Sequence, residues 1–233
     1  MPTEEPPREF QPLPGRTVDR SAAYEVLLQE LLRLTGAEPP QWSEEPNERR
    51  LWRHRARRVV GAAIKARAKA GAGPDEWFEP LMRAAVHEPD PSHVSQLIRP
   101  ALDAYGRRQV RVALTEYLED GTVADAAGAI RAMYWTSIGL RYQPGTKILT
   151  AESAAERDSY RDLSRRTAKA ALRRFVDEDD LDLRRCILPN LSLRRASHPA
   201  ELQDLVTRAL AIARTSDDEY LRHRVEIQAD PEP

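Results

Sequence analysis

Apolar residues recur at helical spacing along nearly the whole chain, and this period constrains the fold more than any other feature of the sequence. Residues at i, i+3, i+4 and i+7 share one face of an α-helix, whereas a half-buried strand alternates apolar and polar residues. The one possible exception is LRYQPGTKIL at residues 140–149, where Pro144-Gly145 suits the central positions of a type II turn. The sequence therefore predicts an all-α fold, with an ordered loop or a very small hairpin at 140–149.

The starts of several helices follow from capping chemistry. A hydroxyl at the N-cap accepts a hydrogen bond from an unpaired backbone N–H, and an acid three residues later reaches back to the cap. Three pairs of residues have this spacing: Thr122 with Asp125, Ser153 with Glu156, and Ser216 with Glu219. The expected helices lie near residues 20–35, 47–70, 75–88, 92–105, 107–119, 123–139, 153–177, 181–194, 199–214 and 217–228.

Prolines mark the ends of the folded region and complicate two of its helices. Residues 1–19 hold five prolines and almost no periodic apolar positions, so this segment and residues 229–233 are expected to be disordered tails. Pro100 and Pro189 fall inside expected helices, where a missing N–H and a ring clash bend the backbone. Pro100 can instead open one long helix that continues to residue 119.

The later helices follow one another in pairs, each with an amphipathic helix, a short acidic loop and a second helix. VRVALTEYLEDGTVADAAGAIRAMYW at residues 110–135 is one example. The acidic loops carry Asp90, Asp120, Asp179 and Asp217. This pattern resembles HEAT-type helical repeats, which stack antiparallel helix pairs into a curved solenoid.

The resemblance covers roughly residues 75–228 and implies one domain over residues 20–228. Residues 20–73 would then be N-terminal capping helices, and residues 74–228 the HEAT-like hairpins. The alternative is a compact irregular helical bundle, because residues 140–152 interrupt any even period.

Small residues crowd the segment AAGAIRAMYW, residues 126–135, just ahead of three bulky ones. In the second helix of a stacked pair, such residues let neighbouring backbones approach closely. Gly128 costs roughly 1 kcal/mol of helix propensity against Ala, so close packing should offset it. Tyr134 shares an apolar stripe with Ile130 and Met133 and is expected in the core. Trp135 lies on a neighbouring arc, where it is either half-buried or presented to a ligand.

The strongest charge feature is the segment 48–70. It holds seven Arg and two Lys against the single acid Glu48, a formal charge of 9 − 1 = +8. Its apolar side leaves five basic side chains to face outward: Arg50, Arg53, His54, Arg57 and Arg58. Clustered arginines bind phosphates or acidic surfaces through bidentate contacts, so Arg50, Arg53, Arg57 and Arg58 are candidate contacts for an anionic partner. The alternative is a solvated face neutralised by acidic neighbours, which the overall 36 basic and 37 acidic residues permit.

No segment carries a recognisable catalytic motif. There is no GxSxG elbow, glycine-rich phosphate loop or Cys-x-x-Cys pair. In VHEPDPSH, residues 86–93, the possible metal donors are separated by prolines and a helix boundary, which favours an interhelical loop over a metal site. Cys186, the single cysteine, lies in an apolar stretch and is expected to be buried. We therefore expect no cofactor and no metal, and an enzyme is disfavoured.

These features favour a non-catalytic binding protein of the scaffold, adaptor, regulatory or immunity type. The expected partner is another protein, held along the stacked helix faces and the loop at 140–152, with Trp135, Arg141 and Tyr142 as candidate contacts. The single cysteine fits a reducing compartment, and MPTEEPPREFQPLPG is not a secretory signal. No apolar run approaches the roughly 20 residues that span a bilayer, so a cytoplasmic protein without a membrane segment is expected.

The alternative function is nucleic-acid binding. HEAT-like folds of this size are similar to the alkylpurine DNA glycosylases, which excise damaged bases with a basic concave groove, aromatic residues and a carboxylate. Trp77, Trp135, Arg131 and Asp125 are residues of the required types, but they do not match that family's motif position by position, so no role is carried over. The net charge of −1 counts against this alternative, and the basic segment 48–70 counts for it.

Overall fold

The computed structural model describes residue 14, residues 20–71 and residues 73–229, so most of the two predicted tails lies outside the described residues. All regular structure in the described part is helical, apart from one isolated β-bridge, and the all-α prediction is confirmed. The α-helices are α1 (Ser21–Thr35), α2 (Pro46–Lys69), α3 (Asp75–His87), α4 (Ser95–Tyr105), α5 (Arg107–Asp120), α6 (Val123–Trp135), α7 (Ala151–Asp158), α8 (Arg161–Asp177), α9 (Leu181–Ile187), α10 (Gln203–Thr215) and α11 (Glu219–Gln228). Three short 3₁₀ turns are η1 (Leu188–Asn190), η2 (Arg195–Ser197) and η3 (Ala200–Leu202).

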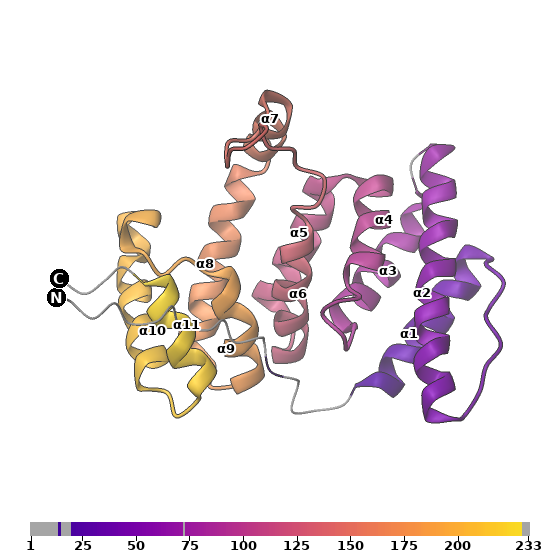
Figure 1. The fold of residues 1–233 in the computed structure, drawn as a ribbon, viewed down its shortest axis with the longest axis horizontal. Helices are drawn as coiled ribbons and strands as arrows, with labels where there is room; N and C mark the ends of the chain where they lie inside the picture. Colours follow the sequence, from indigo (N-terminus) through magenta and orange to yellow (C-terminus); the bar gives the residue numbers. More distant parts are fainter. Residues whose placement is uncertain (1–13, 15–19, 72, 230–233) are drawn as a thin grey trace.

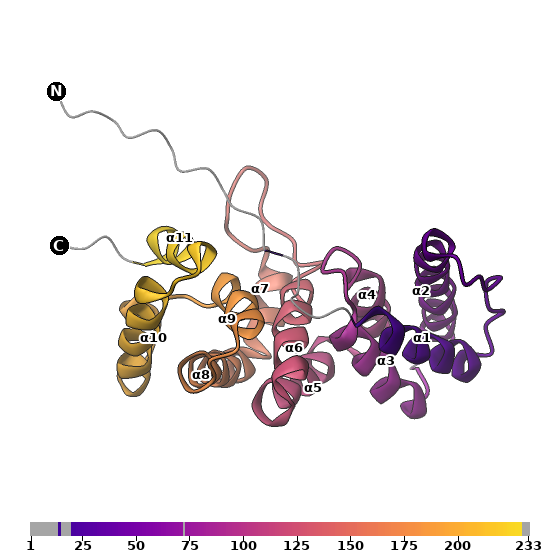
Figure 2. The same ribbon diagram turned by 90° about the horizontal axis from the view of Figure 1, so that it is seen from below.

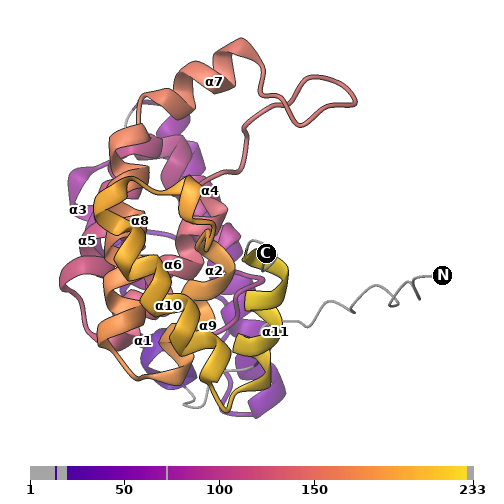
Figure 3. The ribbon, with the colours of Figure 1, turned by 90° about the vertical axis from the view of Figure 1, so that its left-hand side faces the viewer.

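The helices are stacked in successive pairs (Figure 1). Figure 2 shows the first helices of the pairs, α1, α3, α5, α8 and α10, in one row and the second helices, α2, α4, α6, α9 and α11, in the other. The main contacts run within a pair or between neighbouring pairs, so the core extends along the stack. Helix α7 stands outside both rows, at one edge of the stack (Figure 3). This order is compatible with a helical-repeat fold.

The start of α6 follows the predicted capping box. The Thr122 hydroxyl accepts a hydrogen bond from the backbone N–H of Asp125 at 3.2 Å, and the Asp125 carboxylate accepts one from the N–H of Thr122 at 3.0 Å. The acid also lies at the positive end of the helix. A local sequence signal is therefore sufficient to place this helix terminus.

The other two predicted caps are wrong. Thr150 caps α7 by accepting from the N–H of Ser153 at 3.4 Å, and Asp218 caps α11 by accepting from the N–H of Leu221 at 3.0 Å. The Ser153 hydroxyl instead accepts from a backbone N–H of the preceding loop. Each of these helices has several capping residues close together, and spacing alone does not rank them.

The predicted helix over 153–177 is two helices, because the chain bends at Tyr160, the N-cap of α8, with φ −126° and ψ 22°. Pro100 lies inside α4, and Gly106, with φ 78°, separates α4 from α5 as two helices. The helix predicted over 181–194 stops before Pro189: α9 ends at residue 187, and a 3₁₀ turn follows.

At Gly128 the backbone of α6 packs directly against the backbone of α3. A Cβ built on Gly128 would lie 1.9 Å from the carbonyl oxygen of Val86, so only glycine permits this backbone approach. The neighbouring alanines Ala126, Ala129 and Ala132 are fully buried. The predicted reason for the cluster of small residues is confirmed.

Arginines join successive pairs by donating to backbone carbonyls at helix ends. Arg131 in α6 donates to the carbonyl of Glu88, just after α3, at 2.9 Å. Arg174 in α8 donates to three carbonyls at the end of α5 at distances of 2.5–2.9 Å. These carbonyls have no hydrogen-bond partner within their own helix, and they form its negative end. A guanidinium supplies several N–H donors to the carbonyls and a positive charge to the helix end. None of the described helices combines the length and apolar character needed to cross a bilayer.

Candidate functional site

The four arginines predicted to face an anionic partner divide into two groups. Arg53 donates to a carboxylate oxygen of Glu25 at 2.6 Å, which links α2 to α1. Arg57 is only 3% exposed, so the prediction that it faces outward is wrong. Arg50 and Arg58 are exposed. Within the part of the chain that the structure describes, neither has a side-chain hydrogen bond or ion pair.

Arg57 belongs to a buried polar cluster with Glu88 and Tyr24. Its Nε and Nη2 donate to the two carboxylate oxygens of Glu88 at 2.5 and 2.9 Å, and Nε also lies 3.2 Å from the Tyr24 hydroxyl. Burial opposes the charge on Arg57, but Tyr24 and Glu88 together raise its pKa. Burial and the nearby Glu88 also raise the pKa of Tyr24 well above its ordinary value. The predicted ligand residue is therefore a structural link between α1, α2 and the end of α3.

The exposed cations of α2 line two depressions, one of which is shared with α4. Arg58 and Lys65 on α2 and Arg99 on α4 line a depression of about 400 Å³. Arg50, which lies closer to the start of α2, lines a second depression. These four cations have no ion-pair partner among the described residues. We call Arg50, Arg58, Lys65 and Arg99 the α2–α4 cation group.

Tyr134 and Trp135 lie at the end of α6. Tyr134 is 66% exposed, so its predicted place in the core is wrong. It lies on the last turn of α6, where its stripe neighbour Met133 is still buried, so burial of the stripe ends just before Tyr134. Its ring packs edge-on against Trp135, with centroids 5.2 Å apart, and the Trp135 indole donates to the carbonyl of Pro91 at 3.2 Å. Trp135 is half-buried, and Tyr134 presents its ring to solvent.

The segment 140–149 forms the very small hairpin that was one of the two sequence-based alternatives. Tyr142 and Leu149 form an isolated antiparallel bridge, and the N–H of Thr146 donates to the carbonyl of Gln143 at 3.1 Å. Gly145 has φ 70°, as position i+2 of a type II turn requires. Figures 2 and 3 show this hairpin projecting beyond the stack on the side of the second helices. Tyr142 and Ile148 are 55% and 60% exposed, and Arg141 is exposed as well.

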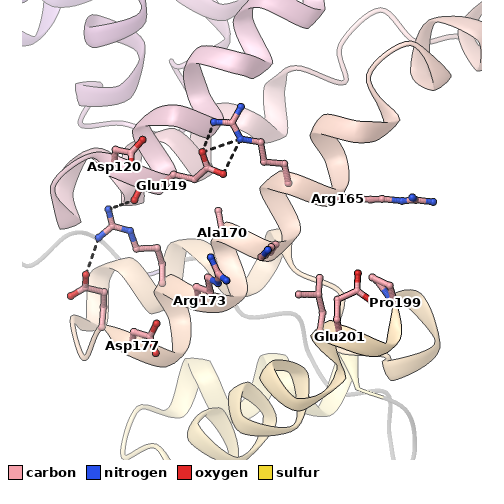
Figure 4. A pocket seen from close by; sticks show the side chains of 13 residues that line it. Glu119, Asp120, Arg165, Ala170, Arg173, Asp177, Pro199 and Glu201 are labelled. Atoms are coloured by element: carbon pink, nitrogen blue, oxygen red, sulfur yellow. Dashed lines mark hydrogen bonds and ion pairs between the residues drawn. The ribbon is translucent and has the colours of Figure 1, made fainter.

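A groove of about 740 Å³ between α5, α8 and η3 is lined by both cations and carboxylates (Figure 4). Arg166 forms a bidentate ion pair with Glu119, which fixes it against α5. Arg165, Lys169 and Arg173 lie at i, i+4 and i+8, so they share one face of α8. These three are exposed and have no ion pair among the described residues. We call them the α8 cation group.

The histidines considered as metal ligands each lie beside an acid and do not converge on one metal site. His87 lies 3.0 Å from Asp125, and His93 lies 3.0 Å from Asp90. No group of three or more His, Cys, Asp or Glu side chains in the described residues is placed to hold a metal ion. Cys186 is 5% exposed, which confirms its predicted burial.

The residues considered for a glycosylase-like role are also dispersed. Arg131 is 6% exposed and donates to the backbone at the end of α3, and Asp125 caps α6. Trp77 is half-buried on α3, in the other row from Trp135 on α6. No family model, curated protein or solved structure matches the chain.

Proposed function

We propose that the chain is a HEAT-type helical-repeat scaffold that binds a protein partner on the side of its second helices. The observation that carries this proposal is the exposure of three large side chains within residues 134–148. Tyr134, Tyr142 and Ile148 are 66%, 55% and 60% exposed. Single exposed apolar residues are ordinary, but two exposed tyrosines and an isoleucine within 15 residues of the chain favour an interface, because tyrosine rings bury much area and keep a polar tip.

The position of these residues favours a macromolecular partner. The hairpin of residues 140–149 projects beyond the helix rows on the side of the second helices (Figure 3), so a partner bound on that side has both the hairpin and α6 within reach. Arg141 adds a cation at the rim, where charges steer association more than they add affinity. A contact that covers the hairpin and the exposed turn of α6 is built on rigid stacked helices, which reduces the ordering cost of binding.

The test is a comparison of two surfaces with purified protein. A variant carrying Tyr134→Ser, Tyr142→Ser and Ile148→Ser should keep the fold, because all three side chains are exposed, and should bind the partner at least about tenfold more weakly. Val26→Ser is the matched control, since Val26 is 62% exposed on α1, in the other row of helices. The partner is first trapped by a photo-crosslinking residue at position 142. Crosslinks that form equally from position 26, or affinity that the triple variant leaves unchanged, would contradict the proposal.

The α2–α4 cation group favours a second candidate, the binding of a nucleic-acid backbone. Each phosphate contact contributes about −0.9 to the slope of log affinity against log salt concentration. Changing Arg50, Arg58 and Lys65 together to Gln should therefore reduce the magnitude of that slope by about 2.7 if all three contact phosphates. The matched control makes the same change at the three positions of the α8 cation group. Equal slopes for both variants, or a wild-type slope near zero, would remove this candidate.

A further inference from the structure

Arg111 in α5 is a buried cation that has no acidic partner among the described residues. Arg111 is 8% exposed. Nη1 donates to the Thr136 hydroxyl at 2.6 Å, Nη2 reaches the Ser164 hydroxyl at 3.5 Å, and Nε is buried with no hydrogen-bond partner. A guanidinium has five N–H donors, so these two contacts leave most of them unused. Within the described residues, no carboxylate lies at ion-pair distance from Arg111.

This arrangement is unlike that of the buried Arg57. Arg57 has the carboxylate of Glu88 at 2.5 Å, whereas the guanidinium of Arg111 lies over the Tyr160 ring, 4.7 Å from its centroid. Burial lowers the pKa of Arg111, and the nearby cation Arg107 lowers it further, while Tyr160 acts in the opposite direction. A buried charge without a counter-ion is unfavourable, so the fold carries a positive charge here at a cost that an anion would offset.

Arg111 lines a pocket of about 520 Å³ between α5, the end of α6 and α8. This volume is within the range of small-molecule sites, which are mostly apolar with a few polar groups that fix orientation. Ile130, Met133 and Ile138 contribute apolar wall, and Tyr134 and Trp135 contribute aromatic rings. Ser164 and Asn190 add polar groups. The pocket thus combines one buried cation with an apolar enclosure and opens beside the exposed ring of Tyr134.

We propose that this pocket binds a carboxylate attached to an apolar body, with Arg111 pairing with the carboxylate and the side chains of α6 and α8 enclosing the body. A planar carboxylate matches the fork of a guanidinium. A single anionic charge balances the single cation, whereas a doubly charged phosphate would keep one charge uncompensated in a half-enclosed site. The proposal does not require a protein partner, so it stands or fails separately from the scaffold function.

The experiment uses isothermal titration calorimetry with the full chain and three probes. 3-Phenylpropionate supplies the carboxylate and an aromatic body, 3-phenylpropanamide keeps the body without the charge, and inorganic phosphate supplies charge without the body. We expect the carboxylate to bind at least tenfold more tightly than either of the other two. Equal binding of the acid and the amide, tighter binding of phosphate, or no binding of the acid up to millimolar concentration would overturn the proposal.

Two variants locate the binding at Arg111. Arg111→Met should fold, because replacing an unpaired buried cation with an apolar chain of similar length removes a desolvation cost, and it should lose at least tenfold in affinity for the acid. Ala168→Phe fills the pocket without altering the guanidinium and should also reduce binding. Arg165→Met removes one exposed cation from α8 and is the control. Affinity unchanged in both pocket variants would refute the site even if the acid binds.

A peptide arm distinguishes two sources of the same carboxylate. An acetylated peptide ending in Leu-Phe with a free C-terminus is compared with its C-terminal amide. Binding of the free peptide and of 3-phenylpropionate points to a pocket that accepts small acids and chain ends alike. Binding of the peptide acid at least tenfold more tightly than 3-phenylpropionate identifies a protein C-terminus as the source. Both outcomes require loss of binding in Arg111→Met, and an amide that binds as well as the acid would overturn the proposal.

Discussion

The contact at Gly128 leads to the sharpest stability prediction, because its sign opposes the one that helix propensity alone gives. Replacing a mid-helix glycine with alanine gains about 1 kcal/mol of propensity when space permits. At Gly128 the added Cβ would lie 1.9 Å from the carbonyl oxygen of Val86, and also 2.8 Å from its carbonyl carbon. To reach an ordinary contact of 3.4 Å, the two backbones must separate by 3.4 − 1.9 = 1.5 Å.

Such a displacement must move α6 away from α3, since the obstacle is backbone and not a flexible side chain. Extra methylene groups in packed cores cost about 1–3 kcal/mol, and a backbone clash of this size belongs at the upper end. Subtracting the propensity gain leaves Gly128→Ala less stable by about 2 kcal/mol. For a chain of this length that loss corresponds to a decrease in Tm of about 4–8 °C.

Gly61 in α2 provides the matched control, because the same substitution meets far less resistance there. Its added Cβ would lie 3.2 Å from the carbonyl oxygen of Gln96 and 3.4 Å from Cγ of Pro100, so a shift of 3.4 − 3.2 = 0.2 Å suffices. We expect Gly61→Ala to equal the parent in stability or exceed it by up to about 1 kcal/mol. Differential scanning calorimetry and urea unfolding measure both variants. A Tm for Gly128→Ala at or above the parent value, or equal shifts in the two variants, would refute the packing between α3 and α6.

Three further predictions test other parts of the fold. Glu88→Gln removes one partner of the buried Arg57–Glu88 pair and should lower the free energy of unfolding by about 3–5 kcal/mol. The double change Arg57→Met with Glu88→Leu should recover much of that loss. Urea unfolding measures both variants, and a double variant no more stable than the single one would contradict the reasoning. Burial, with the nearby His93, Arg57 and Arg58, lowers the pKa of His54, so its protonation opposes folding. The contribution of neutral His54 to the free energy of unfolding is fully present above the unfolded-state pKa of about 6.5 and is lost as the pH falls through the folded-state pKa. His54→Gln should therefore lose less stability than the parent between pH 7.5 and 5. An identical pH dependence in the two proteins would count against this effect of His54. Arg174→Met should reduce stability by about 1–3 kcal/mol because it leaves carbonyls at the end of α5 unsatisfied, whereas Arg173→Met on the exposed side of α8 should change the unfolding free energy by less than about 0.5 kcal/mol.

Local chemistry in the sequence was sufficient for the helical content and several details of packing. The apolar period selects helices over strands because it places one face toward the core. Thr122 and Asp125 mark the start of α6 because both halves of the capping box lie within one turn. Gly128 signals a close approach because its propensity cost needs compensation, and the contact with Val86 supplies it. These inferences depend on residues that are near one another in the chain.

The tertiary structure decided the direction and partners of individual side chains. Arg57 turns inward because Glu88, 31 positions away in the chain, supplies a buried carboxylate. Tyr134 continues an apolar stripe yet remains exposed, because burial of that stripe ends at Met133. Arg111 shows no distinguishing local pattern, and only the packing of α5 against α8 reveals a buried cation without an acid. A period specifies which arc of a helix is apolar, but burial and charge compensation depend on which other helix lies against that arc, and that choice is made by the whole chain.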